Sequence, residues 1–195
     1  MDVVVLIPES TRKDRGGNPK LAAVDSVSDA LAPAARKELT ALRHEVATKA
    51  FPGAKLPAYL RFQGNMYRHI PRDAWEKRAP GVEVVIVSGL YGLLASRDTT
   101  VHYDHSMAEP MPPYGKLNRW WRDHGLPGIL AAYLKAVKPK TVVDLLSLEY
   151  REAVAGYADG LYGIAVKAVD FPGMGRGSQP RRGEKIAEIL RAGKA

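Results

Sequence analysis

The chain has 195 residues, of which 46% are hydrophobic and 26% charged, and its formal net charge is +8. This length and apolar content predict one globular domain rather than a disordered chain. The absence of cysteine excludes disulfides, thiolate metal sites and cysteine nucleophiles. We expect no signal peptide and no membrane span, because the apolar run at 3–7 is too short, and therefore a cytoplasmic location. The basic balance fits either nucleic acid as a partner or an ordinary basic surface.

Short apolar runs rich in β-branched residues predict buried strands at 3–7, 82–87, 141–146 and 163–169. Apolar residues at helical spacing predict helices over 33–50, 57–70, 148–158 and 183–192, and two more over 115–138 with a break at 125–128. Strands separated by helices indicate an α/β or α+β fold. We therefore predict a single α/β domain over residues 1–195, with a mixed central β-sheet flanked by helices.

Polar residues follow the first three expected strands, where α/β proteins place their ligand sites. A carboxylate at such a strand end can act as a general acid or base. The candidate catalytic residues are Glu9, Asp98 and Glu149. Glu9 also fits an ordinary polar loop, and Glu149 fits a favourable charge at a helix N-terminus.

Several other residues near these strand ends are candidates for holding a ligand. Gln63 and Tyr67 share one face of an expected helix, where an amide and a tyrosine can contact a nucleobase or, alternatively, simply pack. The His and Asp residues at 98–105 match no standard metal site, so we expect no metal and no cofactor. The full set of candidate ligand-binding residues is Ser10, Lys13, Gln63, Gly64, Tyr67, Tyr91, Gly92, Arg97, Tyr103, Ser147, Tyr150 and Arg182.

The segment 126–129, between two expected helices, is similar to a helix-hairpin-helix element, whose backbone N–H groups hold a DNA phosphate. Leu130 stands where that motif has its second glycine, so a plain helix pair with Pro127 in the first turn is the alternative. Nearby and C-terminal cations would supply counter-charge for phosphates. The candidate nucleic-acid-binding residues are Lys116, Arg119, Arg122, Pro127, Gly128, Lys135, Arg176, Arg181 and Lys185.

Six segments, taken in order, resemble the YaaA family of peroxide stress proteins. They are the Pro–Glu–Ser loop that ends at Lys13, the aromatic-x-Gly-x-x-Tyr stretch at 62–67, the Leu–Tyr–Gly–Leu–Leu turn at 90–94, the tryptophan pair at 120–121, the strand with a Ser-x-x-Tyr ending at 142–150, and the Arg–Gly–Glu–Lys start at 182–185. Asp104 departs from the family pattern, which has an arginine there. The resemblance implies a single α/β domain with a basic cleft, DNA binding through a helix-hairpin-helix-like element, and protection of DNA in oxidative stress.

Two functions remain open at this point. The first is binding and protection of double- or single-stranded DNA, with affinity that falls as salt rises. The second is an enzyme that cleaves an N-glycosidic bond of a nucleotide or nucleoside in a pocket at the strand ends, and a purely structural role is a third possibility. In the enzyme, Gln63, Tyr67 and Tyr103 would hold the base, and Lys13, Arg97 or Arg182 the phosphate. Neither function implies a membrane, and the sequence predicts no oligomeric state.

Overall fold

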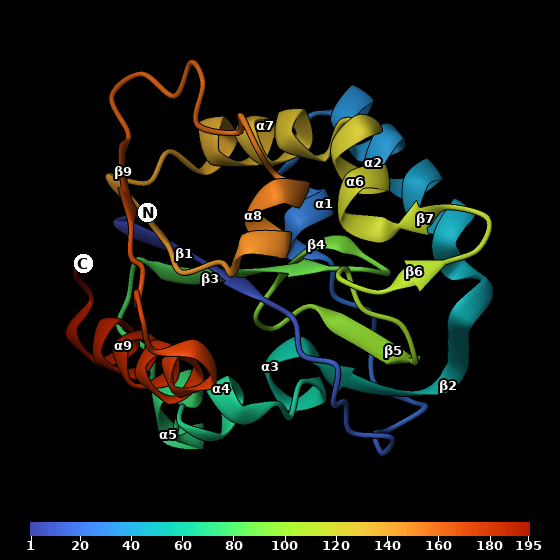
Figure 1. Cartoon of the computed structure of the whole chain (residues 1–195), viewed down its shortest axis with the longest axis horizontal. Coiled ribbons are helices and arrows are strands. Elements are labelled where there is room, and N and C mark those ends of the chain that lie inside the picture. Colours follow the sequence, from blue (N-terminus) through green and yellow to red (C-terminus); the bar gives the residue numbers. More distant parts are fainter.

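The computed structural model describes the backbone of residues 1–195 and every side chain except those of Lys49 and Arg176. Its central sheet consists of β1 (Val3–Pro8), β3 (Val82–Ser88), β4 (Gly92–Ala95), β8 (Thr141–Asp144) and β9 (Ala165–Ala168). These five strands lie in the order β4–β3–β1–β8–β9 (Figure 1). β1, β3, β8 and β9 are parallel, and β4 is antiparallel to β3. The predicted fold class, an α/β fold with a mixed central sheet flanked by helices, is confirmed.

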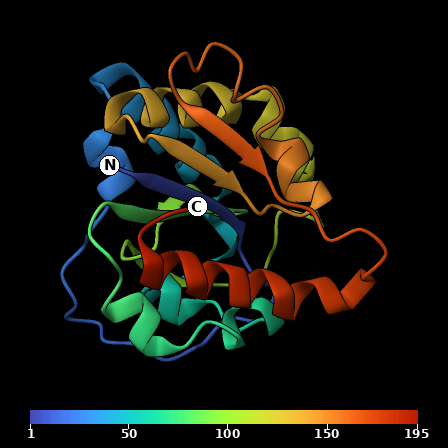
Figure 2. The same cartoon turned by 90° about the vertical axis from the view of Figure 1, so that its left-hand side faces the viewer.

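Helices cover both faces of this sheet (Figure 2). One face carries α1 (Ser26–Ala30), α2 (Pro33–Val46), α6 (Leu117–Asp123), α7 (Leu126–Val137) and α8 (Leu148–Ala153), and the other carries α3 (Ala58–Arg61), α4 (Asn65–Arg68), α5 (Arg72–Glu76) and α9 (Ser178–Ala192). Every residue of β1 and β3 is therefore buried, which is why these strands are unbroken apolar runs in the sequence.

Smaller elements complete the fold around the sheet. They are the antiparallel pair β2 (Ala50–Pro57) and β5 (Thr99–Tyr103), the short pair β6 (Pro110–Met111) and β7 (Gly115–Lys116), and the 3-10 helices η1 (Ala47–Lys49) and η2 (Gly175–Gly177). β2 and β5 escaped the sequence analysis because their residues are only partly buried and carry no long apolar run.

The carboxyl ends of β1, β3 and β8 meet at one edge of the sheet. β1 lies between the other two, so that Val3 is paired with both Val82 and Thr141. The segments that follow these strands are therefore neighbours in space, although they are far apart in the sequence. This edge is where the sequence places most of the candidate site.

The helix expected over 57–70 is interrupted between α3 and α4. At the interruption the loop after β1 takes the backbone donors: the N–H of Gln63 donates to the carbonyl oxygen of Arg12 (2.9 Å) and to the hydroxyl of Ser10 (3.1 Å), and the N–H of Gly64 donates to the same hydroxyl (3.0 Å). Those two groups would otherwise donate within a continuous helix. The break therefore fixes the loop after β1 against the segment before α4.

The predicted helix-hairpin-helix element is not confirmed. The turn lies at Gly125, the first residue of the expected break at 125–128, and its φ of 97° suits glycine. Pro127 and Gly128 then belong to the first turn of α7, whose next residue, Ile129, is buried against the core. The apolar spacing of α7 extends through the segment that the sequence analysis assigned to a hairpin, and Pro127 takes the position that proline favours.

The contact between α9 and α4 depends on a glycine. A Cβ added at Gly183 would lie 2.3 Å from the carbonyl oxygen of Met66 and 2.7 Å from Cβ of His69. We expect Gly183→Ala to lower the free energy of unfolding by about 1–3 kcal/mol, because the helices must move apart. The measurement is urea unfolding followed by circular dichroism.

Gly128→Ala is the matched control, since Gly128 also lies in a helix but has nothing within 4 Å of a built Cβ. This variant is expected to gain up to about 1 kcal/mol from helix propensity. Equal effects of the two substitutions would contradict a tight α4–α9 contact.

Candidate functional site

The carboxylate of Glu9 lies immediately after β1, and its side chain is fully buried. Its Oε1 accepts hydrogen bonds from the backbone N–H groups of Gly89 (2.8 Å) and Met107 (2.9 Å). Its Oε2 accepts one from the hydroxyl of Tyr103. A buried carboxylate is tolerated only when donors of this kind replace water. Glu9 therefore ties the loop after β3 and the segment after β5 to the end of β1.

Lys13 supplies the positive charge that balances Glu9. Its Nζ lies 3.8 Å from Oε2 of Glu9, and it donates a hydrogen bond of 3.0 Å to the carbonyl oxygen of His105. The ammonium also lies 4.2 Å from the centroid of the Tyr103 ring, within range of a cation–π contact. Both members of the ion pair are buried, so removing either one would leave a buried unpaired charge.

Tyr103 connects this pair to β3. Its hydroxyl is 2.7 Å from Oγ of Ser88, which also accepts a hydrogen bond from the backbone N–H of Tyr91 (3.2 Å). Burial, together with the negative charge of Glu9, raises the pKa of Tyr103 well above its usual value. The phenol is therefore neutral, and its O–H can donate a hydrogen bond to the Glu9 carboxylate.

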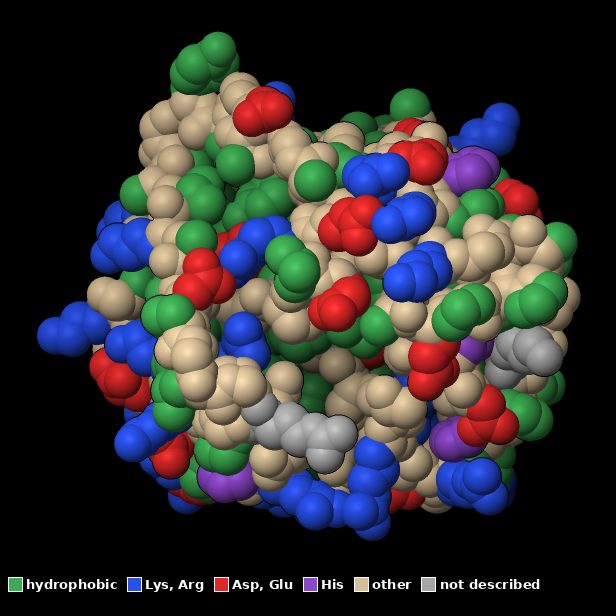
Figure 3. Space-filling view, viewed as in Figure 1, with side chains coloured by type: hydrophobic (Ala, Val, Ile, Leu, Met, Phe, Trp, Pro, Cys, Tyr) green, Lys and Arg blue, Asp and Glu red, His purple; other side chains and the backbone are tan. Residues whose placement is uncertain are grey.

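A polar cavity of about 390 Å³ opens beside Glu9 at the strand ends. Figure 3 shows a hollow near the centre of this face of the molecule. The wall combines hydroxyls, two side-chain amides and one exposed guanidinium, that of Arg12. The lining residues are Pro8, Glu9, Ser10, Thr11, Arg12, Gly64, Asn65, Ser106, Ala108, Ser147, Tyr150 and Gln179.

Gly64 allows the cavity wall to close on the β1 side. A Cβ at this position would lie 2.6 Å from Cβ of Ser10, which is closer than real Cβ contacts come. Ser10 in turn donates a hydrogen bond of 2.5 Å to the carbonyl oxygen of Arg12. Ser10 thus links the loop that carries Arg12 to the backbone of residues 63–64.

Tyr150 and Ser147 form the wall on the β8 side. Burial raises the pKa of Tyr150 well above its usual value, and the charge of Glu9 raises it further, so its hydroxyl is neutral. Ser147 precedes α8, and its side chain makes no capping hydrogen bond with that helix. Both hydroxyls are therefore suited to hydrogen bonding with a polar ligand.

The structure brings together part of the predicted site. Glu9, Ser10, Gly64, Ser147 and Tyr150 line the cavity. Lys13 and Tyr103 lie behind it as partners of Glu9, and Tyr67 lies under the loop, donating a hydrogen bond of 2.8 Å to the carbonyl oxygen of Pro8. These positions were predictable because the residues follow strands that end at the same edge.

Asp98 and Arg97 lie away from the cavity. Asp98 is fully buried and accepts hydrogen bonds from the backbone N–H groups of Ser26 (2.6 Å) and Ala95 (2.8 Å), while burial raises its pKa. It therefore fixes the start of α1 against the turn after β4. The guanidinium of Arg97 is exposed and donates to the carbonyl oxygen of Glu76 (3.1 Å).

Five further predicted residues do not line the cavity. The amide of Gln63 donates to the carbonyl oxygen of Leu60 (2.8 Å), and the hydroxyl of Tyr91 accepts from the backbone N–H of Val101 (2.9 Å). Gly92 has a φ of 65° and lies against Trp121, Glu149 is exposed in the first turn of α8, and Arg182 is buried in α9.

Five polar wall residues are absent from the predicted site residues, namely Thr11, Arg12, Asn65, Ser106 and Gln179. Thr11 and Arg12 lie in the loop between Ser10 and Lys13, which were both singled out. Asn65 directly follows Gly64, and Ser106 comes three residues after Tyr103, so each lay beside a residue that was singled out. Gln179 is different, since α9 begins five residues earlier than its apolar pattern indicates. No signal within the sequence placed Gln179 at the strand ends.

The predicted nucleic-acid-binding residues are spread over several elements. Arg119 and Arg122 of α6 both contact the carboxylate of Glu152, at 3.3 and 3.2 Å. In α9, Arg181 pairs with Glu184 and Lys185 with Glu188, at 3.0 and 2.9 Å. Figure 3 accordingly shows basic and acidic side chains side by side on this face.

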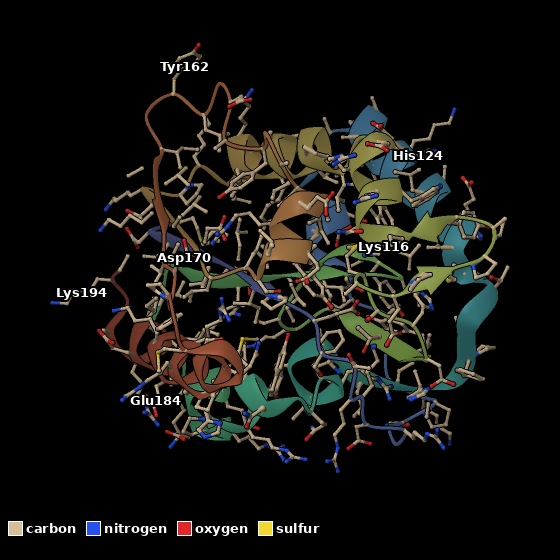
Figure 4. The ribbon with its side chains drawn as sticks, in the orientation of Figure 1. Lys116, His124, Tyr162, Asp170, Glu184 and Lys194 are labelled. Carbon is tan, nitrogen blue, oxygen red and sulfur yellow. The ribbon has the colours of Figure 1, made fainter. Side chains whose placement is uncertain are left out.

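The remaining basic residues of that prediction are dispersed. Lys116 and Lys135 are exposed on different parts of the surface, Lys116 at the start of α6 (Figure 4) and Lys135 in α7. The side chain of Arg176 lies outside the described residues. In the part of the chain that the structure describes, no three His, Asp or Glu side chains are grouped so that they could hold a metal ion. No helix there has the length and apolar character needed to cross a membrane.

The hydrogen bond from Tyr103 to Glu9 leads to a test of stability. We expect Tyr103→Phe to lower the free energy of unfolding by about 1–3 kcal/mol, because the buried carboxylate loses a donor. Tyr162→Phe is the control, since Tyr162 is 95% exposed and points away from the body of the protein (Figure 4). Denaturant unfolding of both variants gives the comparison, and a loss for Tyr103→Phe no larger than that of the control would argue against the network.

Comparison with known proteins identifies the family to which the chain belongs. The family model described as Peroxide stress protein YaaA matches residues 14–177. This region includes all strands except β1 and holds Asn65, Ser106, Ser147 and Tyr150, whereas Glu9 precedes it. No curated protein matches the chain. Since the model matches well over half of its length, the chain belongs to the YaaA family of peroxide stress proteins.

Proposed function

We propose that this protein acts in the peroxide stress response by binding nucleic acid, and that the cavity at the strand ends accepts one nucleotide unit. The cavity itself carries this proposal. Its volume of about 390 Å³ falls in the range of small-molecule sites, which span roughly 300–1,000 Å³. The family supports the link to peroxide stress. Binding would protect DNA by covering it.

The chemistry of the wall suits a nucleotide. The side-chain amide of Asn65 offers both donors and acceptors for the edge of a base, and the Tyr150 phenol offers a donor. Arg12 offers a fork of donors for a phosphate. The charge of Glu9 does not oppose a phosphate, because Lys13 and three hydrogen-bond donors already compensate it.

The overall charge supports a general electrostatic attraction to DNA, and it gives no support for recognition of a particular base sequence. The net charge of +8 favours association with a polyanion. Several surface arginines, among them Arg119 and Arg122, are already paired with carboxylates. We therefore expect phosphate contacts with little base preference, and the same cavity would take either a free nucleotide or a base turned out of the stack.

Cleavage of an N-glycosidic bond is the second candidate function. The observation that favours it is that Glu9, which carries a carboxylate, is among the residues that line the cavity. Both oxygens of this carboxylate already accept hydrogen bonds, and its side chain is fully buried. This geometry suits a residue that holds loops in position better than one that reaches a sugar, so binding is the function that the site supports best.

Arg12 provides the first test of the cavity. We expect Arg12→Ala to weaken binding of a nucleoside monophosphate about tenfold, since one charge-assisted hydrogen bond is lost. Arg97→Ala is the matched control, because Arg97 is another exposed arginine but lies away from the cavity. Isothermal titration calorimetry measures both, and equal losses would place the nucleotide elsewhere.

DNA binding is tested by titrating a short duplex and a single strand at two salt concentrations. We expect the affinity to fall at least about tenfold between ~50 and ~200 mM salt, because phosphate contacts release counterions. Mass spectrometry of the same samples for free bases tests the glycosidase candidate. Release of a base that is abolished by Glu9→Gln in a folded variant would favour that enzyme, and no binding at low salt would overturn the DNA-binding proposal.

A further inference from the structure

Arg182 has a buried guanidinium whose hydrogen bonds are incomplete. The residue is 8% exposed, and its Nη1 donates a hydrogen bond of 2.8 Å to Oγ of Ser178. Its Nε has no hydrogen-bond partner among the described residues. A buried charged donor without an acceptor is costly, so native proteins rarely leave one unless a ligand or water completes it. Arg182 lies in α9, one turn after Gln179, which lines the cavity.

The carboxylates nearest to Arg182 are engaged with a different arginine. Asp144 and Asp170 accept from Arg151, at 3.3 and 2.9 Å. Burial lowers the pKa of Arg182, although Asp170 and Asp144 act in the opposite direction. The ring of Phe171 lies 5.5 Å from the guanidinium carbon and covers one side of it. The charges of Arg151 and Arg182 equal those of Asp144 and Asp170 in number. The Nε–H of Arg182 nevertheless has no acceptor among the described residues.

The start of α9 lies beside this guanidinium. α9 has 15 residues, and no side chain caps its N-terminal end. Ser178, the partner of Arg182, is the first residue of the helix, and Gln179, the second, lines the cavity. Figure 2 shows that α9 begins on the side toward which the strand arrows point. η2 leads directly into α9 and Pro180 carries no N–H, so the first turn offers the backbone N–H groups of Ser178 and Gln179. The dipole of a long helix favours an anion at such an end.

We infer that the first turn of α9 and the guanidinium of Arg182 together form a binding site for a phosphate-class anion at the Gln179 end of the cavity. The inference rests on the proposed function and deepens it, because it adds the guanidinium of Arg182 to that of Arg12 as a partner for the phosphate of the bound nucleotide. The anion completes the hydrogen bonds of Arg182 Nε and of the helix N–H groups. The base then lies toward Asn65 and Tyr150.

The test uses the full chain, with inorganic phosphate, a nucleoside and the matching nucleoside monophosphate as probes. We expect Arg182→Gln to weaken binding of phosphate and of the monophosphate about tenfold, while binding of the nucleoside changes less than twofold. Arg191→Gln is the matched control, since it removes the same charge from the same helix, at an exposed side chain that is paired with Asp73. Its effect is expected to stay below twofold. Equal phosphate affinities of Arg182→Gln and wild type would overturn the inference.

A second measurement on the wild-type protein covers the case in which Arg182→Gln does not fold. Nuclear magnetic resonance follows the Nε–H signal of Arg182 and the backbone N–H signals of Ser178 and Gln179 during a phosphate titration. We expect all three to shift together along one binding curve. An unmoved Arg182 signal at saturating phosphate would overturn the inference.

The three probes separate this inference from the proposed function. If nucleoside and DNA still bind, but the affinity for phosphate is the same in Arg182→Gln and in the wild type, only the anion site is rejected. Phosphate binding that depends on Arg182, with neither nucleoside nor DNA bound, would keep the anion site and reject the nucleotide cavity.

Discussion

The buried carboxylate of Glu9 is the interaction on which the arrangement of this site depends. It lies where β1 ends, and its donors come from Gly89 in the loop after β3 and from Tyr103 and Met107 at and after the end of β5. Each donor must be in place for the charge to be tolerated in the interior, and Lys13 must be near. The same hydrogen bonds that make the buried charge tolerable also hold the loops at the positions that enclose the cavity. Glu9 thus acts as an organiser of the wall.

The network around Glu9 leaves the charged groups behind the cavity wall and the neutral polar groups on it. The groups that face the cavity, such as Asn65 and Gln179, are neutral, while the charges behind them are compensated. Preorganised donors lose little entropy when a ligand binds, so modest numbers of contacts give useful affinity. The cationic groups lie at the margins, with Arg12 on the loop after β1 and Arg182 in α9. This separation is what a ligand with one anionic end and one neutral end requires.

The sequence predicted the centre of the fold better than its margins. The strands 3–7 and 82–87 were evident because β1 and β3 are buried on both faces. Glu9, Ser147 and Tyr150 were placed correctly at the strand ends because parallel strands share an edge. Asp98 was not, because β4 runs back along β3 and carries the following residues to the opposite edge. A short antiparallel return of this kind leaves no clear periodic signal, and neither does the early start of α9 that brings Gln179 to the cavity.

The pairing of β1 also determines when the cavity can exist during synthesis of the chain. Val3 is paired with Val82 and Thr141, so the central strand emerges long before either neighbour. The wall also includes Gln179, which belongs to the last helix in chain order and is therefore synthesised after the other lining residues. Contacts of such sequence separation form slowly. No fragment that stops before α9 can hold a complete wall, so the cavity is complete only after the last helix has packed into place.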